Sequence, residues 1–125
     1  MSKVIVIDDE PFILMMIEDK LRRAGIEVIT LRESVNAISV IKKERPDLII
    51  LDWMMPELSG IDLCNMIKAD IELKNIPIFM LTAKGQDADK QLGLKTGAIL
   101  YITKPFSPKV LLEMVKKFLD KGEGS

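Results

Sequence analysis

The nine residues 48-LIILDWMMP-56 decide the fold of this chain. Four aliphatic side chains lead directly into one carboxylate, Asp52, and a turn follows that carries Pro56, Ser59 and Gly60. A short apolar run bounded by turn residues is typical of a parallel-sheet strand that is buried on both faces. Open parallel sheets place their ligand sites at the carboxyl ends of the strands, so this pattern puts Asp52 at a candidate site.

A second apolar run, residues 3–7, ends in the same way with Asp8 and Asp9. Two buried strands that each end in acid predict one acidic cluster at one edge of a sheet. Pro11 follows shortly and suits the first turn of a helix, so the acids before it could instead cap that helix. Both interpretations fit the residues alone.

Strand and helix patterns alternate along the whole chain. Strands are expected at 3–7, 27–31, 48–52, 76–81 and 98–102, and helices at 11–24, from 33 or 34 to 45, from 59 or 60 to 69, at 86–96 and at 108–120. Short loops between alternating elements imply a parallel sheet with helices on both faces. The strand at 27–31 alternates less cleanly and is expected at an edge. We expect one domain, residues 1–121, and a flexible tail, residues 122–125.

Composition narrows the class of protein. The chain has 125 residues, of which 48% are hydrophobic and 30% charged, with a net charge of −1. The chain has no excess of positive charge, so its composition does not predict direct binding to nucleic acid or to an anionic membrane. No apolar stretch approaches the roughly 20 residues that span a bilayer. The single cysteine, Cys64, fits a helix core and a reducing compartment, so a cytoplasmic protein is expected. With no histidine, any metal would be held by oxygen.

Three sequence blocks resemble the receiver domain of two-component response regulators: 7-IDDE-10, 51-LDWMMP-56 and 102-ITKPF-106. Thr82, between the second and third blocks, completes the pattern. The resemblance covers roughly residues 2–121. It implies an α/β, flavodoxin-like (βα)5 fold, a doubly wound five-stranded parallel sheet of strand order 2-1-3-4-5.

The resemblance also implies roles for individual residues. Asp52 would be the phosphoacceptor. Asp8, Asp9, Asp52 and the backbone carbonyl of Met54 would hold Mg²⁺, which prefers hard oxygen ligands. The metal, together with Lys104, would keep Asp52 ionised among the neighbouring acids.

Polar groups at the ends of the fourth and fifth strands would complete the site. Lys104, the Thr82 hydroxyl and the backbone N–H of Ala83 would contact the phosphoryl group. Thr82 and Tyr101 would form the switch pair, which moves inward on phosphorylation. The Lys104–Pro105 bond is cis in the family pattern, and the sequence alone does not distinguish cis from trans.

The function that follows is a phosphorylation-activated signalling switch. A sensor histidine kinase or a phosphotransfer protein would supply the phosphoryl group. The surface of the fourth helix, fifth strand and fifth helix would then change its preference for a downstream protein partner or for a second copy of the chain. No enzymatic activity is expected beyond self-phosphorylation from small donors and self-dephosphorylation.

Two other classes share parts of the pattern. A phosphohydrolase of the haloacid dehalogenase type also uses an aspartate nucleophile with Mg²⁺, but it needs a second acid where this chain has Met54. A flavodoxin that binds flavin shares the fold, but its first loop cradles phosphate, and Asp8, Asp9 and Glu10 would repel phosphate unless a metal intervened.

Two further expectations concern apolar residues. Trp53 is expected to cover the rim of the site. Ile99 and Leu100 stand where DNA-binding regulators commonly carry two acids. Successive strand side chains point to opposite faces, so one of the pair should be buried and the other, expected to be Leu100, should extend an apolar surface near Tyr101.

Overall fold

The computed structural model describes the backbone of residues 2–83 and 97–124, and the side chains within these ranges up to residue 120. The strands are β1 (Lys3–Ile7), β2 (Glu27–Leu31), β3 (Leu48–Asp52), β4 (Ile78–Ala83) and β5 (Leu100–Lys104). The described helices are α1 (Pro11–Arg23), α2 (Ala37–Glu44), α3 (Gly60–Ala69) and α5 (Pro108–Gly124). The helix predicted at 86–96 lies outside the described residues. No helix among those described is long and apolar enough to cross a bilayer.

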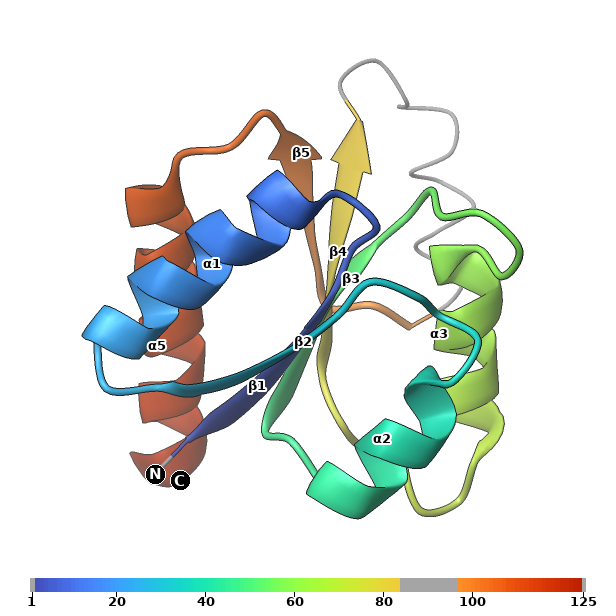
Figure 1. Cartoon of the computed structure of the whole chain (residues 1–125). Helices are drawn as coiled ribbons and strands as arrows, with labels where there is room; N and C mark the ends of the chain where they lie inside the picture. Colours follow the sequence, from blue (N-terminus) through green and yellow to red (C-terminus); the bar gives the residue numbers. More distant parts are fainter. Residues whose placement is uncertain (1, 84–96, 125) are drawn as a thin grey trace.

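The five strands form one sheet in the order β2-β1-β3-β4-β5, and every pairing is parallel. This confirms the predicted strand order and the position of β2 at an edge. Ile7, the last residue of β1, lies opposite Leu51, which precedes Asp52 in β3. The register therefore brings the two acidic strand ends together at one edge of the sheet (Figure 1).

Each face of the sheet is covered by its own helices, α1 and α5 on one side and α2 and α3 on the other (Figure 1). Along β1, Val4 and Val6 pack into the α1/α5 core, whereas Ile5 and Ile7 pack into the α2/α3 core. This alternation follows from the two-residue period of a strand. Because both faces are covered by helices, the side chains on both sides of each strand are buried. The strands are therefore continuous apolar runs in the sequence.

Strands β4 and β5 each begin and end two residues later than predicted. At the start of β4, the N–H of Ile76 is used in a turn and Pro77 has no N–H, so the ladder begins after them. At the other end, Thr82 lies opposite Thr103, and Lys104 closes β5. The polar site residues therefore belong to the strands themselves and are held by the ladder.

The starts of α1 and α2 differ from what the sequence suggested. Glu10 is the N-cap residue of α1 but makes no side-chain cap hydrogen bond, and the carboxylate of Asp8 instead accepts the N–H of Glu10 at 2.9 Å. Helix α2 begins at Ala37, later than predicted, because the hydroxyl of Ser34 donates to the carbonyl of Leu58 and does not cap the helix. The acids after β1 are thus free to form a site.

The helix ends fit the sequence in one case and differ in another. Gly25 has a φ of 84°, a conformation that glycine adopts readily, and it follows the end of α1 as predicted. Helix α5 continues to Gly124, so residues 122–124, which were predicted to be a flexible tail, have helical backbone. No proline stands after Pro108 to interrupt this helix.

Helix α3 starts in direct contact with the strand that carries Asp52. Ser59, one of the two residues at which this helix was predicted to start, is its N-cap. The hydroxyl of Ser59 accepts a hydrogen bond from the N–H of Asp62 at 3.2 Å. The N–H of Gly60 donates to the carbonyl of Trp53 at 2.9 Å. A Cβ atom on Gly60 would lie 2.1 Å from the backbone oxygen of Asp52. A glycine is therefore required for α3 to approach the strand this closely.

Candidate functional site

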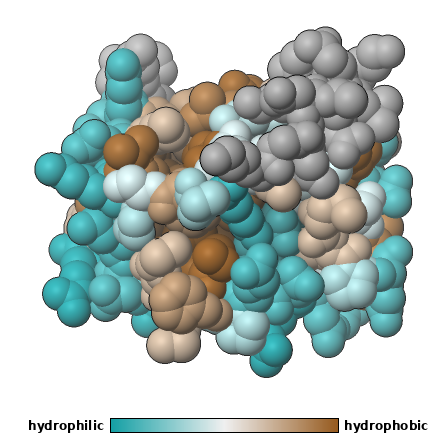
Figure 2. Space-filling model, turned by 90° about the horizontal axis from the view of Figure 1, so that it is seen from above, coloured by the Kyte–Doolittle hydropathy of each residue, from teal (hydrophilic) through white to brown (hydrophobic). Residues whose placement is uncertain are grey.

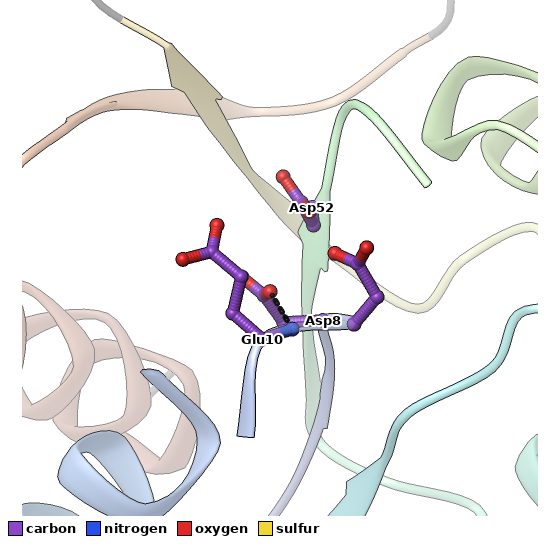
Figure 3. Close-up of side chains that lie close together, drawn as sticks. Asp8, Glu10 and Asp52 are labelled. Carbon is purple, nitrogen blue, oxygen red and sulfur yellow. Dashed lines mark hydrogen bonds between the residues drawn. The ribbon is translucent and has the colours of Figure 1, made fainter. Parts of the chain in front are cut away.

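Four carboxylates gather at the edge where β1 and β3 end. Asp8, Asp9, Glu10 and Asp52 each offer an oxygen, and these oxygens all lie within 4.8 Å of one another. Figure 3 shows Asp8 and Glu10 beside the end of β1 and Asp52 at the end of β3. Asp8 is 0% exposed and Asp52 5%, whereas Glu10 lies on the surface. The predicted acidic cluster is therefore present, and its two innermost members are removed from water.

Lys104 enters this cluster from the end of β5. Its Nζ lies 2.8 Å from Asp8 Oδ2, 3.1 Å from Glu10 Oε1 and 3.3 Å from Asp52 Oδ1. A cation among clustered carboxylates reduces their mutual repulsion. The structure thus unites residues that are 96 positions apart in the sequence, Asp8 and Lys104, as the predicted pattern required.

Burial sets the electrostatics of the site. Burial raises the pKa of Asp52 from 3.8 to about 7, the charge of Asp8 adds to this rise, and Lys104 opposes it. Burial also raises the pKa of Asp8, against the effect of Lys104. Burial by itself would lower the pKa of Lys104, but Asp8 and Asp52 together outweigh it and raise that pKa. One lysine therefore does not fully compensate the buried acids at neutral pH.

The donor set fits a hard divalent cation. Carboxylate oxygens are the side-chain ligands that Mg²⁺ prefers, and Asp8, Asp9 and Asp52 present them in one cluster. The buried Oδ2 of Asp8 accepts no hydrogen bond of good geometry and contacts Lys104 only as an ion pair. The side chain of Met54 ends in a soft thioether, so only its backbone carbonyl is suited to join a site for a hard cation.

The charged residues and the predicted switch pair belong to opposite faces of the sheet, at the same edge where the strands end. Ile50 and Ile102 pack into the α1/α5 core, and the two-residue period puts Asp52 and Lys104 on that same face. Tyr101 packs against the α2/α3 core, and Thr82 shares this face by the same alternation from Met80. Thr82 is buried at 3% exposure, and Tyr101 is half-buried.

Two apolar expectations are corrected by the structure. Trp53 does not cover the rim of the site: it is buried in the α2/α3 core, with its ring 6.3 Å from that of Tyr101. Leu100 is half-buried against the α1/α5 core, and Ile99 is the exposed member of the pair at 50%. The alternation was right, but β5 starts at Leu100, and this residue faces helix α5.

The surface around the site is mixed in character. Figure 2 views the end of the molecule where the strands terminate, and hydrophobic and hydrophilic surface alternate across it. Phe12 and Met15, in the first half of α1, are exposed at 74% and 68%. Single exposed apolar side chains are ordinary on protein surfaces, so these two residues do not by themselves identify a binding surface.

The model of the response regulator receiver domain family matches residues 4–116. The chain belongs to this family. The receiver domain is a signalling module, and the two other classes considered from the sequence, the phosphohydrolase and the flavin-binding protein, find no support in the comparisons.

Curated relatives agree with this assignment. The receiver domain is 42% identical over 122 residues to the alkaline phosphatase synthesis transcriptional regulatory protein PhoP of Bacillus subtilis, covering 98% of this chain and 50% of the relative. It is 46% identical over 116 residues to the phosphate regulon transcriptional regulatory protein PhoB of Pseudomonas aeruginosa, covering 93% of this chain and 51% of the relative. The chain thus spans about half the length of these relatives.

Solved structures place the fold in the same family. The chemotaxis protein CheY4 of Vibrio cholerae superimposes with a TM-score of 0.87 at 34% identity, over 94% of this chain and 98% of that one. The receiver domain of the Francisella response regulator 1452 gives a TM-score of 0.88 at 33% identity, over 98% and 99% of the two chains. The flavodoxin-like architecture is therefore shared along nearly the whole length.

Three features of the site were missed in the sequence. Glu10 contacts Lys104, and its position next to Asp9 was the available signal. Gly60 approaches the backbone of Asp52, which a glycine after a strand and turn could have suggested. The bond from Ser34 to the loop after β3 had no local signal, because its partner is 24 residues away. The structure also has Lys104–Pro105 in the cis form, which the sequence left open.

Proposed function

We propose that Asp52 accepts a phosphoryl group and that the domain acts as a phosphorylation-dependent switch. The observation that carries this is one buried carboxylate at the end of β3 with Lys104 3.3 Å away and three further acids around it. A carboxylate oxygen of Asp52 would attack the phosphorus of a phosphohistidine. The new bond is O–P, the bond that breaks is N–P, and the imidazole of the donor leaves.

The residues around Asp52 would position the phosphoryl group and balance its charge, which is the main contribution of a protein to phosphoryl transfer. Lys104 would donate to one phosphoryl oxygen. The hydroxyl of Thr82 and the N–H of Ala83, at the end of β4, would donate to others. Support comes from the ladder, in which Thr82 and Ala83 lie opposite Thr103 and Lys104.

Asp8, Asp9, Asp52 and the carbonyl of Met54 would hold Mg²⁺. When bound, Mg²⁺ would neutralise negative charge on the carboxylates and on the phosphoryl oxygens. The protein residues would orient the acceptor, and the metal together with Lys104 would keep it ionised at neutral pH. The raised pKa of Asp52, about 7, supports the need for a cation beyond Lys104.

The signal would pass through Thr82 and Tyr101 to the surface formed by the fourth helix, β5 and α5. Thr82 and Tyr101 share the α2/α3 face of the sheet, so a movement of one is felt by the other through Met80, which lies opposite Tyr101. The donor would be a sensor histidine kinase or phosphotransfer protein in the cytoplasm. The recipient would be a protein partner or a second copy of the chain.

Intact-mass analysis with acetyl phosphate tests the acceptor. The wild-type chain should gain one phosphoryl group with Mg²⁺ and none with a chelator, and Asp52→Asn should gain none. Asp9→Asn should lose most of the Mg²⁺-dependent gain, because it removes a metal ligand.

Asp62→Asn is the matched control, because Asp62 is an exposed acid on α3 outside the cluster. It should be phosphorylated like the wild type. Phosphorylation of Asp52→Asn at the wild-type level, or an undiminished gain in Asp9→Asn, would show that the assignment is wrong.

A further inference from the structure

The loop between β3 and α3, residues 53–59, is fixed at its ends by backbone hydrogen bonds. The N–H of Trp53 donates to the carbonyl of Leu81 at 2.9 Å, and the N–H of Gly60 donates to the carbonyl of Trp53 at 2.9 Å. Met54, whose carbonyl is assigned to the cation, lies just inside the first of these anchors. Its position therefore depends on how the remainder of the loop is held.

The middle of this loop has an unfavourable backbone conformation. Glu57 has a φ of 68°, in the left-handed region that non-glycine residues rarely adopt. Such a conformation persists only where surrounding contacts enforce it. Within the loop, the N–H of Leu58 donates to the carbonyl of Pro56 at 2.9 Å, which closes a tight turn around Glu57. A contact from outside the loop is needed to hold this turn in place.

Ser34 supplies such a contact. It lies in the connection between β2 and α2, is only 2% exposed, and donates its hydroxyl to the carbonyl of Leu58. The carbonyl of Ser34 in turn accepts the N–H of Ala37 at 3.1 Å, at the first residue of α2. Ala37 and Ile41 of that helix are fully buried. The bond therefore ties the loop to a helix that is anchored in the core.

The space beside this bond shows why it matters. A cavity of about 150 Å³ lies between the two connections and is lined by Ser34, Val35, Met55, Pro56 and others. The two connections are therefore not tightly packed against each other here. If the hydroxyl were removed, the loop would have room to shift, and the part-buried carbonyl of Leu58 would lose this hydrogen bond.

We propose that Ser34 is a positioning residue for the metal site. By holding Leu58, it keeps the loop in the conformation that directs the carbonyl of Met54 toward the acids. This inference rests on the proposed function, since it assumes that Asp8, Asp9, Asp52 and that carbonyl bind Mg²⁺. Groups that orient metal ligands typically change metal affinity by about 10- to 100-fold when removed.

The test is a Mg²⁺ titration followed by the fluorescence of Trp53, the single tryptophan, which directly follows Asp52. Ser34→Ala should raise the dissociation constant for Mg²⁺ about tenfold. Ser34→Thr should restore it to within about twofold, because it keeps the hydroxyl and its methyl group has the adjoining cavity to occupy. Ser34→Cys, which keeps the size but donates weakly, should be intermediate and serves if the alanine variant does not fold.

Ser39→Ala is the matched control, because Ser39 is exposed and its hydroxyl donates to the carbonyl of Asn36, the N-cap residue of the same helix. It should bind Mg²⁺ like the wild type. Thermal unfolding without Mg²⁺ distinguishes a role of Ser34 in stability from a role in metal binding. If Ser34→Ala lowers the melting temperature but leaves Mg²⁺ affinity unchanged, Ser34 is merely structural and the proposal is wrong.

Asp9→Asn distinguishes this proposal from the proposed function. If Asp9→Asn abolishes Mg²⁺ binding while Ser34→Ala and Ser34→Cys bind as the wild type does, only the role of Ser34 is overturned. If Asp9→Asn binds Mg²⁺ like the wild type, or if the wild type binds none, the metal site itself is wrong and the role of Ser34 is overturned with it.

Discussion

The two faces of the sheet bury similar aliphatic cores but differ at the edge where the strands end. On the α1/α5 face this edge carries Asp8, Asp52 and Lys104, which are charged or titratable and mostly buried. On the α2/α3 face it carries Thr82 and Tyr101, whose polar groups are hydroxyls. The difference teaches that a single sheet can confine the repulsion between buried charges to one face, while contacts on the other face depend on packing.

The largest effect on stability should come from the α2/α3 face, where helix α3 packs against the sheet. Gly60→Ala would place a Cβ atom 2.1 Å from the backbone oxygen of Asp52, and backbone cannot yield as a flexible side chain can. We expect a loss of about 3–5 kcal/mol in the free energy of unfolding, measured by urea denaturation. The loss should be large at both pH 5 and pH 8, because the clash is with backbone atoms and not with the titrating carboxyl group.

Gly25→Ala is the control for Gly60→Ala. A Cβ atom there meets nothing within 4 Å, and only the φ of 84° opposes the substitution. Its cost should be about 1 kcal/mol. Equal losses at the two glycines would show that backbone conformation, and not the contact with Asp52, makes Gly60 necessary.

The second largest effect on stability should come from Asp52, on the charged α1/α5 face. The pKa of Asp52 is raised in the folded state from 3.8 to about 7, so the folded state binds the proton more tightly than the unfolded state. Metal-free stability should therefore fall as the pH rises from about 4 to about 7. Linkage sets an upper bound of about 4 kcal/mol. Asp52→Asn should remove most of this fall and stabilise the metal-free protein at pH 8 by about 2 kcal/mol.

Urea denaturation with a chelator at pH 5 and pH 8 measures the effect of Asp52→Asn. Adding Mg²⁺ to the wild type should raise stability at pH 8 more than at pH 5, because the metal competes with the proton for the carboxylate. A wild-type protein that is equally stable at both pH values without metal would contradict the raised pKa.

The smallest effect should come from the exposed arm of the charged cluster. Glu10 contacts Lys104 at 3.1 Å, but its side chain is 58% exposed. Exposed ion pairs contribute little, so Glu10→Gln should change the free energy of unfolding by less than about 0.5 kcal/mol. Comparing this variant with Asp52→Asn in the same buffer tests whether burial or proximity to Lys104 determines how much each acid changes the free energy of unfolding. A change as large as that of Asp52→Asn would favour proximity.

The parallel sheet and the meeting of Asp8 with Asp52 could be predicted because both depend on local patterns, whereas the strand order was predicted from the resemblance to the receiver family. Buried parallel strands are continuous apolar runs, and their carboxyl ends share one edge. Lys104 could be placed only through the resemblance, since a lysine before a proline has no structural meaning alone. The start of β4 was predicted too early because Ile76 is apolar, although its N–H is used in a turn.

Other features depend on contacts that no local pattern encodes. Trp53 was expected at the rim because it follows the site, yet it is buried beside Tyr101 on the opposite face. Ser34 was expected to open a helix, which is its common local role, yet its hydroxyl reaches another loop. In both cases a tertiary contact replaced the role that neighbours in sequence suggested.

The three contacts of Lys104 have a consequence for any ligand that enters the site. An ammonium group has three N–H donors, and acids already stand within 3.3 Å of its nitrogen at three places. A further acceptor bound at Asp52 must therefore displace one of them. Glu10 is the member that water can solvate most readily, and it immediately precedes α1. A ligand at Asp52 that took over this contact would leave the Glu10 carboxylate unpaired at the surface, next to the start of α1.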